Sequence, residues 1–193
     1  MGGSTEILDP SKLTRSGIRC LEELAQIALL AHSTQVAPEW LIVTCTTCVE
    51  AHFDRVINLL IEISQVENNR FAKSLLVDGY DDIFRSWDSR LKWLDKGFGV
   101  AISGDRPMQD YRALVDLRNA VVHGQGNLTT LQQRNFGKLL TLKRRLTQLL
   151  AVQFSGPKVL LLTGIEPNII EICRGVTVFL DSAVLALYAE INV

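Results

Sequence analysis

The segment LRNAVVHG, residues 117–124, brings an arginine, an asparagine and a histidine within six positions of one another. The guanidinium of Arg118 has a planar, forked set of donors that matches a phosphoryl group. The imidazole of His123 can take up or release a proton near neutral pH, as general acid–base chemistry requires. On a helix Asn119 lies one turn before His123 on the same face, where its amide can orient the imidazole or bind a ligand oxygen. Arg118, Asn119 and His123 are therefore the candidate catalytic residues.

Together these groups suit cleavage of RNA by attack of a 2′-hydroxyl on the adjacent phosphate. Because the nucleophile belongs to the substrate, the protein has to supply only proton transfer and charge stabilisation, and the chemistry needs no metal ion or cofactor. His123 would act as the general acid or base, Arg118 would stabilise the transition state and Asn119 would orient the reacting groups. The alternative is a capped, solvated helix end without a catalytic role, and residue types and spacing alone favour that alternative.

These residues close a predicted amphipathic helix over residues 108–123, which Gly124 is expected to end. On a helical wheel Arg118 falls within the apolar face of this helix. A buried guanidinium without a partner is costly, so Arg118 must either reach past its apolar neighbours to solvent or pair with a carboxylate. Glu50, at the edge of the apolar face of an earlier helix, is the proposed partner that positions Arg118. A role as an ordinary surface glutamate is the alternative for Glu50.

Apolar residues recur at helical spacing along most of the 193 residues, which predicts an all-α fold, a bundle of antiparallel helices with additional helices. The predicted helices cover residues 10–31, 38–65, 69–76, 81–96, 108–123, 129–154 and 166–191. Asp78 and Gly79 are expected to break the chain, and residues 98–107 to form a loop. Residues 157–164 are compatible with a short strand or an extended connector. No linker is apparent, so a single helical domain over 1–193 is expected.

The motif RNAVVHG, together with its surroundings, resembles the signature of the HEPN superfamily. That signature is an arginine and a histidine separated by four to six residues, with an asparagine after the arginine. The segment CVEAHFDRVINLL resembles the second helix of HEPN proteins, WDSRLKWLDKGFG the segment before the motif helix, and IIEICRGVTVFLDSAVLAL the closing helix. The subgroup that the chain most resembles is the RiboL-PSP-type HEPN proteins.

The resemblance implies a helical bundle that forms a homodimer, in which two motifs face one cleft. It also implies a metal-independent endoribonuclease that leaves 2′,3′-cyclic phosphate and 5′-hydroxyl ends and acts as a toxin or in antiviral defence. The implied partners are an RNA substrate, a second copy of the chain and an antitoxin or other regulatory protein. Some HEPN domains are inactive, so the alternative is a non-catalytic module that binds RNA, a nucleotide or a protein partner.

Three basic residues of the predicted 129–154 helix, Arg134, Lys138 and Arg145, fall on one stripe. A basic stripe beside an RNA cleft can contact phosphates, whereas most such stripes are solvated surface. The formal net charge of −1 argues against indiscriminate binding of polyanions, so any contact with RNA has to depend on a local basic patch of this kind.

Cys45, Cys48 and His52 project onto one face of the predicted 38–65 helix, which raises the possibility of a zinc site. Cys20 or Cys173 would have to complete its ligand set. A CxxC pair inside a helix, with no second ligand pair nearby, is a weak metal signal, and the same face carries leucines and isoleucine. Core packing is therefore the favoured interpretation, and no metal is expected.

The chain shows no charged leader followed by an apolar stretch, which argues against a secretory signal. With four cysteines and no export signal, reduced thiols and a cytoplasmic location are expected. The apolar segment VTVFLDSAVLALYA, residues 176–189, is shorter than a membrane span and contains Asp181. It is predicted to be a core helix, and no membrane association is expected.

Overall fold

A computed structural model describes residues 12–34, 36–65 and 68–189. The fold is all-α, as predicted, with one small antiparallel hairpin. The helices are α1 (Arg15–Thr34), α2 (Pro38–Ile63), α3 (Arg70–Phe84), α4 (Trp87–Lys92), α5 (Arg106–His123), α6 (Thr130–Gln133), α7 (Phe136–Leu150) and α8 (Glu166–Leu187); a π-helical turn (Trp93–Gly97) follows α4, and the hairpin consists of β1 (Gln153–Ser155) and β2 (Lys158–Leu160).

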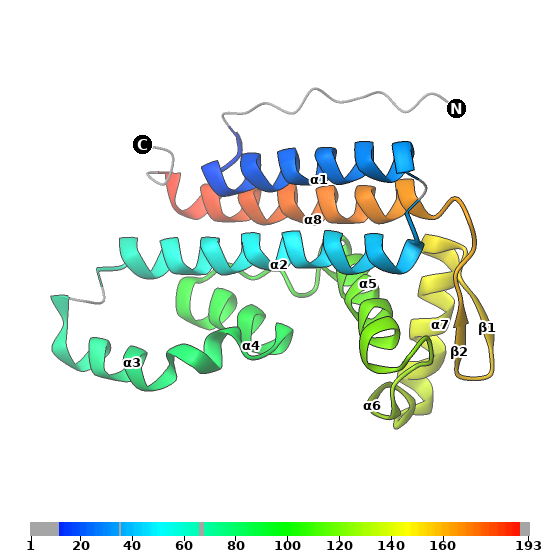
Figure 1. Cartoon of the computed structure of the whole chain (residues 1–193). Helices are drawn as coiled ribbons and strands as arrows, with labels where there is room; N and C mark the ends of the chain where they lie inside the picture. The colour runs from blue at the N-terminus through cyan, green and yellow to red at the C-terminus, as the bar shows by residue number, and fades with distance from the viewer. Residues whose placement is uncertain (1–11, 35, 66–67, 190–193) are drawn as a thin grey trace.

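Three long helices, α1, α2 and α8, lie side by side, with α1 antiparallel to the other two (Figure 1). Helix α5 crosses this layer at a steep angle and packs against both α2 and α8, with α7 on its other flank (Figure 1). Phe53 of α2 and Leu114 and Leu117 of α5 are completely buried where these helices meet. Burying a side chain of this size contributes about 1.5–3 kcal/mol. The apolar stripe of α5 therefore fixes the helix on the core and leaves its polar stripe at the surface.

A buried polar cluster ties α1, α2 and α8 together. The carboxylate of Asp181 in α8 accepts hydrogen bonds from the backbone N–H of Thr14 at 2.8 Å and from its hydroxyl at 3.0 Å. The same carboxylate lies 3.2 Å from Nε2 of His52 in α2, and Nδ1 of His52 lies 2.9 Å from the Ser16 hydroxyl. His52 and Asp181 are fully buried. At Gly17 an added Cβ would lie 1.7 Å from the Asp181 carboxylate, so the close approach requires glycine.

Helix α3 extends beyond its predicted end. It runs through Asp78 and Gly79, the expected break, and ends at Phe84. A single glycine inside a helix costs only about 1 kcal/mol, which packing of the following turn can offset. The interruption lies instead at Ser86, whose hydroxyl accepts a hydrogen bond from the backbone N–H of Ser89 and thereby caps α4.

The single helix predicted over 129–154 is divided into α6 and α7. The Asn135 side chain accepts a hydrogen bond from the backbone N–H of Lys138 at 3.0 Å and caps the start of α7, while Arg134 ends α6. Ala151 then adopts a left-handed conformation and ends α7 before the hairpin. Of the two alternatives for 157–164, the strand is correct for β2. Within the described segments, no helix combines the length and apolar character needed to cross a membrane.

Candidate functional site

The motif lies at the carboxyl end of α5, because a tight turn begins immediately after His123. The backbone N–H of Gly124 donates to the carbonyl groups of Asn119 and Ala120 and closes the helix. A Cβ at Gly124 would lie 1.8 Å from the carbonyl oxygen of Asn127, so only glycine lets the chain fold back this closely. The glycine that follows the histidine in the sequence thus places the imidazole at the very end of the helix.

The three predicted catalytic residues converge. Nη1 of Arg118 lies 3.2 Å from Oδ1 of Asn119 and 3.3 Å from Nε2 of His123. A guanidinium can only donate, so the oxygen of Asn119 and the ring nitrogen of His123 are the acceptors. Arg118 and Asn119 are half-buried and His123 is exposed, so the guanidinium reaches outward past its apolar neighbours.

Arg118 and Asn119 line a pocket of about 390 Å³ between α2, the start of α4 and α5. His123 does not line it but lies beside it through the contact with Arg118. The remaining lining residues come mainly from α2, from the junction of α3 and α4, and from α5: Thr46, Glu50, Arg85, Ser86, Trp87, Asp88, Arg90, Arg112, Val115, Asp116 and Leu131. Two of the three motif residues therefore border a concave site, while His123 is exposed beside it.

Four arginines line this pocket, and they differ in their partners. Three form ion pairs with carboxylates: Arg85 with Asp82 at 3.0 Å, Arg90 with Asp54 at 2.6 Å and Glu50 at 3.1 Å, and Arg112 with Asp88 at 2.5 Å. Arg118 differs, because in the described part of the chain no carboxylate lies within ion-pair distance of its guanidinium. Its positive charge is therefore available to an anionic ligand.

Glu50 pairs with Arg90 and not with Arg118, contrary to expectation. Arg90 is only 5% exposed and lies between Glu50 and Asp54, which are one turn apart on α2. Burial alone would lower the pKa of Arg90, but the hydrogen bond and charge of Asp54 and the charge of Glu50 raise it above its ordinary value. Glu50 nevertheless lines the same pocket as Arg118. No role was predicted for Arg90 from the sequence. The signal was the same as for Arg118, an arginine on the apolar side of a helix, here next to Leu91 in α4.

The predicted basic stripe is interrupted by the break between α6 and α7. Lys138 and Arg145 line a second hollow of about 560 Å³ between α5 and α7, whereas Arg134 lies at the break after α6 and outside its lining. Nη2 of Arg145 lies 2.6 Å from the Asp110 carboxylate, so much of its charge is matched. Lys138 forms no ion pair within the residues that the structure describes. Of the three, Lys138 thus remains the candidate for phosphate contact in this hollow.

The two hollows adjoin, because Arg112 and Asp116 line both of them. Burial raises the pKa of Asp116, while a hydrogen bond from Gln132 and the charge of Arg112 act in the opposite direction. Nε2 of Gln132 donates to the Asp116 carboxylate at 3.2 Å and to its backbone oxygen at 2.8 Å. These hydrogen bonds attach α6 to α5 beside the motif.

The cysteines and His52 are buried in the core and have protein partners. Sγ of Cys48 lies 3.5 Å from Sγ of Cys20, and His52 contacts Ser16 and Asp181. The hydrogen bond from Cys48 lowers the pKa of Cys20 to about 7. No group of three or more histidine, cysteine and acidic side chains suited to a metal ion occurs among the described residues.

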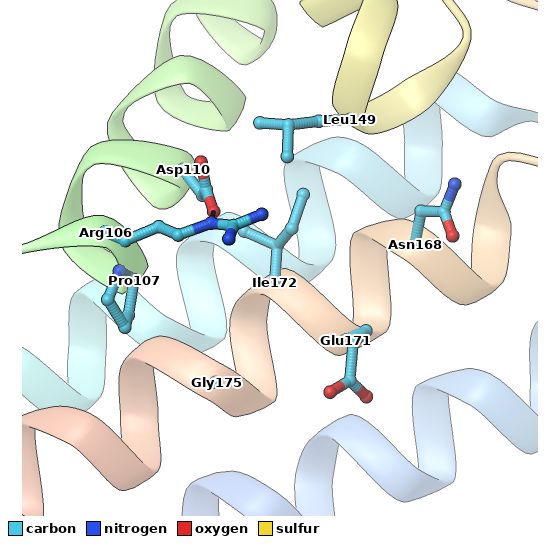
Figure 2. A pocket seen from close by; sticks show the side chains of 8 residues that line it. All are labelled: Arg106, Pro107, Asp110, Leu149, Asn168, Glu171, Ile172 and Gly175. Atoms are coloured by element: carbon cyan, nitrogen blue, oxygen red, sulfur yellow. Dashed lines mark ion pairs between the residues drawn. The ribbon is translucent and has the colours of Figure 1, made fainter. Parts of the chain in front are cut away.

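Another pocket, of about 350 Å³, lies at the opposite end of α5 from the motif, next to α7 and α8 (Figure 2). Arg106 points toward Asp110 there, with Nε and the carboxylate 3.6 Å apart (Figure 2). Asp110 also pairs with Arg145, so this carboxylate already has two cationic neighbours. Asn168 and Glu171 of α8 line the other side. The pocket contains none of the motif residues.

No protein-family model, curated protein or solved structure matches this chain. The resemblance of its motif to the HEPN signature therefore remains a prediction from the sequence.

Proposed function

We propose that the protein is a metal-independent endoribonuclease whose catalytic residues are Arg118, Asn119 and His123. One observation carries the proposal: Arg118, which has no carboxylate within ion-pair distance among the described residues, lines a pocket, and its guanidinium lies 3.3 Å from an exposed imidazole. An anion-binding group beside a proton-transfer group is the minimum that cleavage by an internal 2′-hydroxyl needs. The proposed substrate is accordingly RNA, with a phosphate bound at Arg118.

In the proposed reaction His123 takes the proton of the 2′-hydroxyl, and the 2′-oxygen attacks the adjacent phosphorus. Arg118 stabilises the additional negative charge on the phosphoryl oxygens, and Asn119 helps to hold the guanidinium in place. The bond from phosphorus to the 5′-oxygen breaks, and that oxygen takes up a proton. The products are a 2′,3′-cyclic phosphate and a 5′-hydroxyl end. No step requires a metal ion or cofactor.

The reaction needs one group that accepts a proton and one that donates a proton, whereas each chain carries one motif histidine. The proposal therefore includes a homodimer in which the second imidazole comes from the other copy. Exposed apolar side chains near the carboxyl end of α5 and on α6 and α7 support such an interface. They are Val122 at 43%, Leu131 at 72%, Phe136 at 72% and Leu140 at 51% exposure.

A ribonuclease of this kind would act in the cytoplasm as a toxin or antiviral effector restrained by an antitoxin or another regulatory protein. The four buried cysteines are free thiols, which suits a reducing compartment. The position of the exposed His123 beside the pocket supports the idea that a protein bound over the end of α5 would block access to the site.

The experiment is cleavage of a labelled RNA in the presence of excess chelator. We expect cleavage to persist, to leave cyclic phosphate ends and to fall by about 10²–10⁴ in His123→Ala, the typical contribution of a general acid or base. His32→Ala is the matched control, since His32 is an exposed histidine in the last turn of α1. RNA binding without cleavage would reject the enzyme and favour a non-catalytic binding module. Sedimentation of the intact chain tests the homodimer separately.

A further inference from the structure

The pocket at Arg118 contains a carboxylate that the proposed reaction does not use. The side chain of Glu50, on α2, is 37% exposed and lines the pocket, while its Oε1 lies 3.1 Å from Nη2 of Arg90. One oxygen of the carboxylate is thus anchored by a neighbour, and the group still has lone pairs free for a ligand. Such an arrangement is suited to recognising N–H donors.

Arg90 holds this carboxylate in a defined position. Nε and Nη2 of Arg90 donate to the two oxygens of Asp54 at 2.6 and 3.1 Å, which gives the guanidinium a fixed, two-point orientation. Its side chain is 6% exposed, and its central carbon lies 5.4 Å from the ring centre of Trp87. A buried guanidinium with these restraints cannot follow a moving Glu50. The Glu50 carboxylate thus has one fixed, positively charged partner in the wall of the pocket.

The pocket also has an apolar part among its polar and charged side chains. Trp87, Val115 and Leu131 contribute apolar surface, and Leu131 is 72% exposed beside the opening of the pocket. The volume of about 390 Å³ lies within the range of small-molecule sites. Arg118 from α5 and Glu50 from α2 both line this one space. A phosphate and a group rich in N–H donors can therefore be bound by the same pocket.

We infer that this pocket binds the guanine nucleotide next to the scissile phosphate, with Glu50 as the residue that selects the base. Guanine presents two adjacent donors, N1–H and the N2 amine, which match the two oxygens of one carboxylate. Adenine and cytosine place an acceptor beside their amino group, and uracil flanks its single N–H with carbonyl groups; each of these acceptors would face the negative carboxylate. Glu50 thus favours guanine by attraction and disfavours the other bases by repulsion.

This inference rests on the proposed function for the position of the phosphate, but its test does not require cleavage. Binding of guanosine, adenosine, cytidine and uridine 3′-monophosphates to the intact chain is measured by calorimetry. We expect guanosine 3′-monophosphate to bind about 10–100-fold more tightly than the others, the effect of hydrogen bonds to a charged group. Inosine 3′-monophosphate, which lacks the N2 amine, should bind with intermediate affinity.

Glu50→Gln should abolish the preference for guanine, because an amide replaces one acceptor by a donor. Glu62→Gln, on the exposed end of the same helix, is the matched control and should retain it. Equal binding of the four nucleotides, or a preference that survives in Glu50→Gln, would overturn the inference. If Glu50→Gln does not fold, the comparison of guanosine with inosine decides the question in the unaltered protein. A preference for guanine without RNA cleavage would reject the ribonuclease and support the guanine site. RNA cleavage without a preference for guanine would support the ribonuclease and reject the guanine site.

Discussion

Replacing Gly17 by alanine tests whether the buried hydrogen bonds around Asp181 hold α1 against α2 and α8. The new Cβ would lie 1.7 Å from Oδ2 of Asp181, the oxygen that accepts the 2.8 Å hydrogen bond from the backbone N–H of Thr14. The carboxylate therefore has to move, and it loses this hydrogen bond in a site without access to water. Leaving the buried carboxylate without this hydrogen bond costs about 1–3 kcal/mol and displacing closely packed atoms costs about 1–3 kcal/mol more, from which the helix preference for alanine recovers up to about 1 kcal/mol. The free energy of unfolding should thus fall by about 2–4 kcal/mol.

The assay is urea denaturation followed by circular dichroism, with a thermal melt in parallel. For a chain of this size the loss corresponds to a decrease in Tm of about 5–15 °C. Gly175→Ala in α8 is the matched control, because an added Cβ there meets nothing within 4 Å. It should raise the free energy of unfolding by about 0.5–1 kcal/mol. A Gly17→Ala protein as stable as the unaltered chain would refute the proposed role of this close approach.

Three other substitutions probe the surroundings of the motif. In Gly124→Ala the Cβ would lie 1.8 Å from the carbonyl oxygen of Asn127, so both Tm and RNA cleavage should decrease; an unchanged melt would show that the turn has room. Arg90→Met removes the buried partner of two carboxylates that are about a third exposed, so it should lower the free energy of unfolding, measured in urea, by about 1–3 kcal/mol; a loss within experimental error would contradict the pairing. Burial raises the pKa of Asp116 in the folded state, so its ionised form destabilises the fold above that pKa. Asp116→Asn should therefore be more stable than the unaltered chain in urea at neutral pH, and this advantage should shrink as the pH falls toward about 4; a constant difference across this range would exclude the linkage.

The main helices were predictable because each carries a long apolar stripe that must face the core. Spacing also brought Arg118, Asn119 and His123 together, since these residues lie within two turns of one helix. The helix breaks were not predictable from periodicity. They depend on single capping side chains, Ser86 before α4 and Asn135 before α7, whereas a glycine inside α3 has no such effect.

The sequence alone did not predict which side chains from other helices contact the site residues. Wheel projections identified Glu50 as an acidic residue near the core, but they contain no information on which helix lies opposite it. The short helix α4 brings Arg90 between Glu50 and Asp54, so Glu50 has a partner nearer than Arg118. The stripe of Arg134, Lys138 and Arg145 was projected on an unbroken helix, whereas Arg134 lies at the break before α7.

The contact between Arg118 and His123 has a consequence for the order of events on the proposed enzyme. In the proposed reaction, Nε2 of His123 cannot take up a proton while it accepts a hydrogen bond from the Arg118 guanidinium, 3.3 Å away. When a phosphodiester enters, its oxygens compete for the same guanidinium and release the imidazole. On the proposed enzyme, binding of the substrate would then also free the histidine to act as a base.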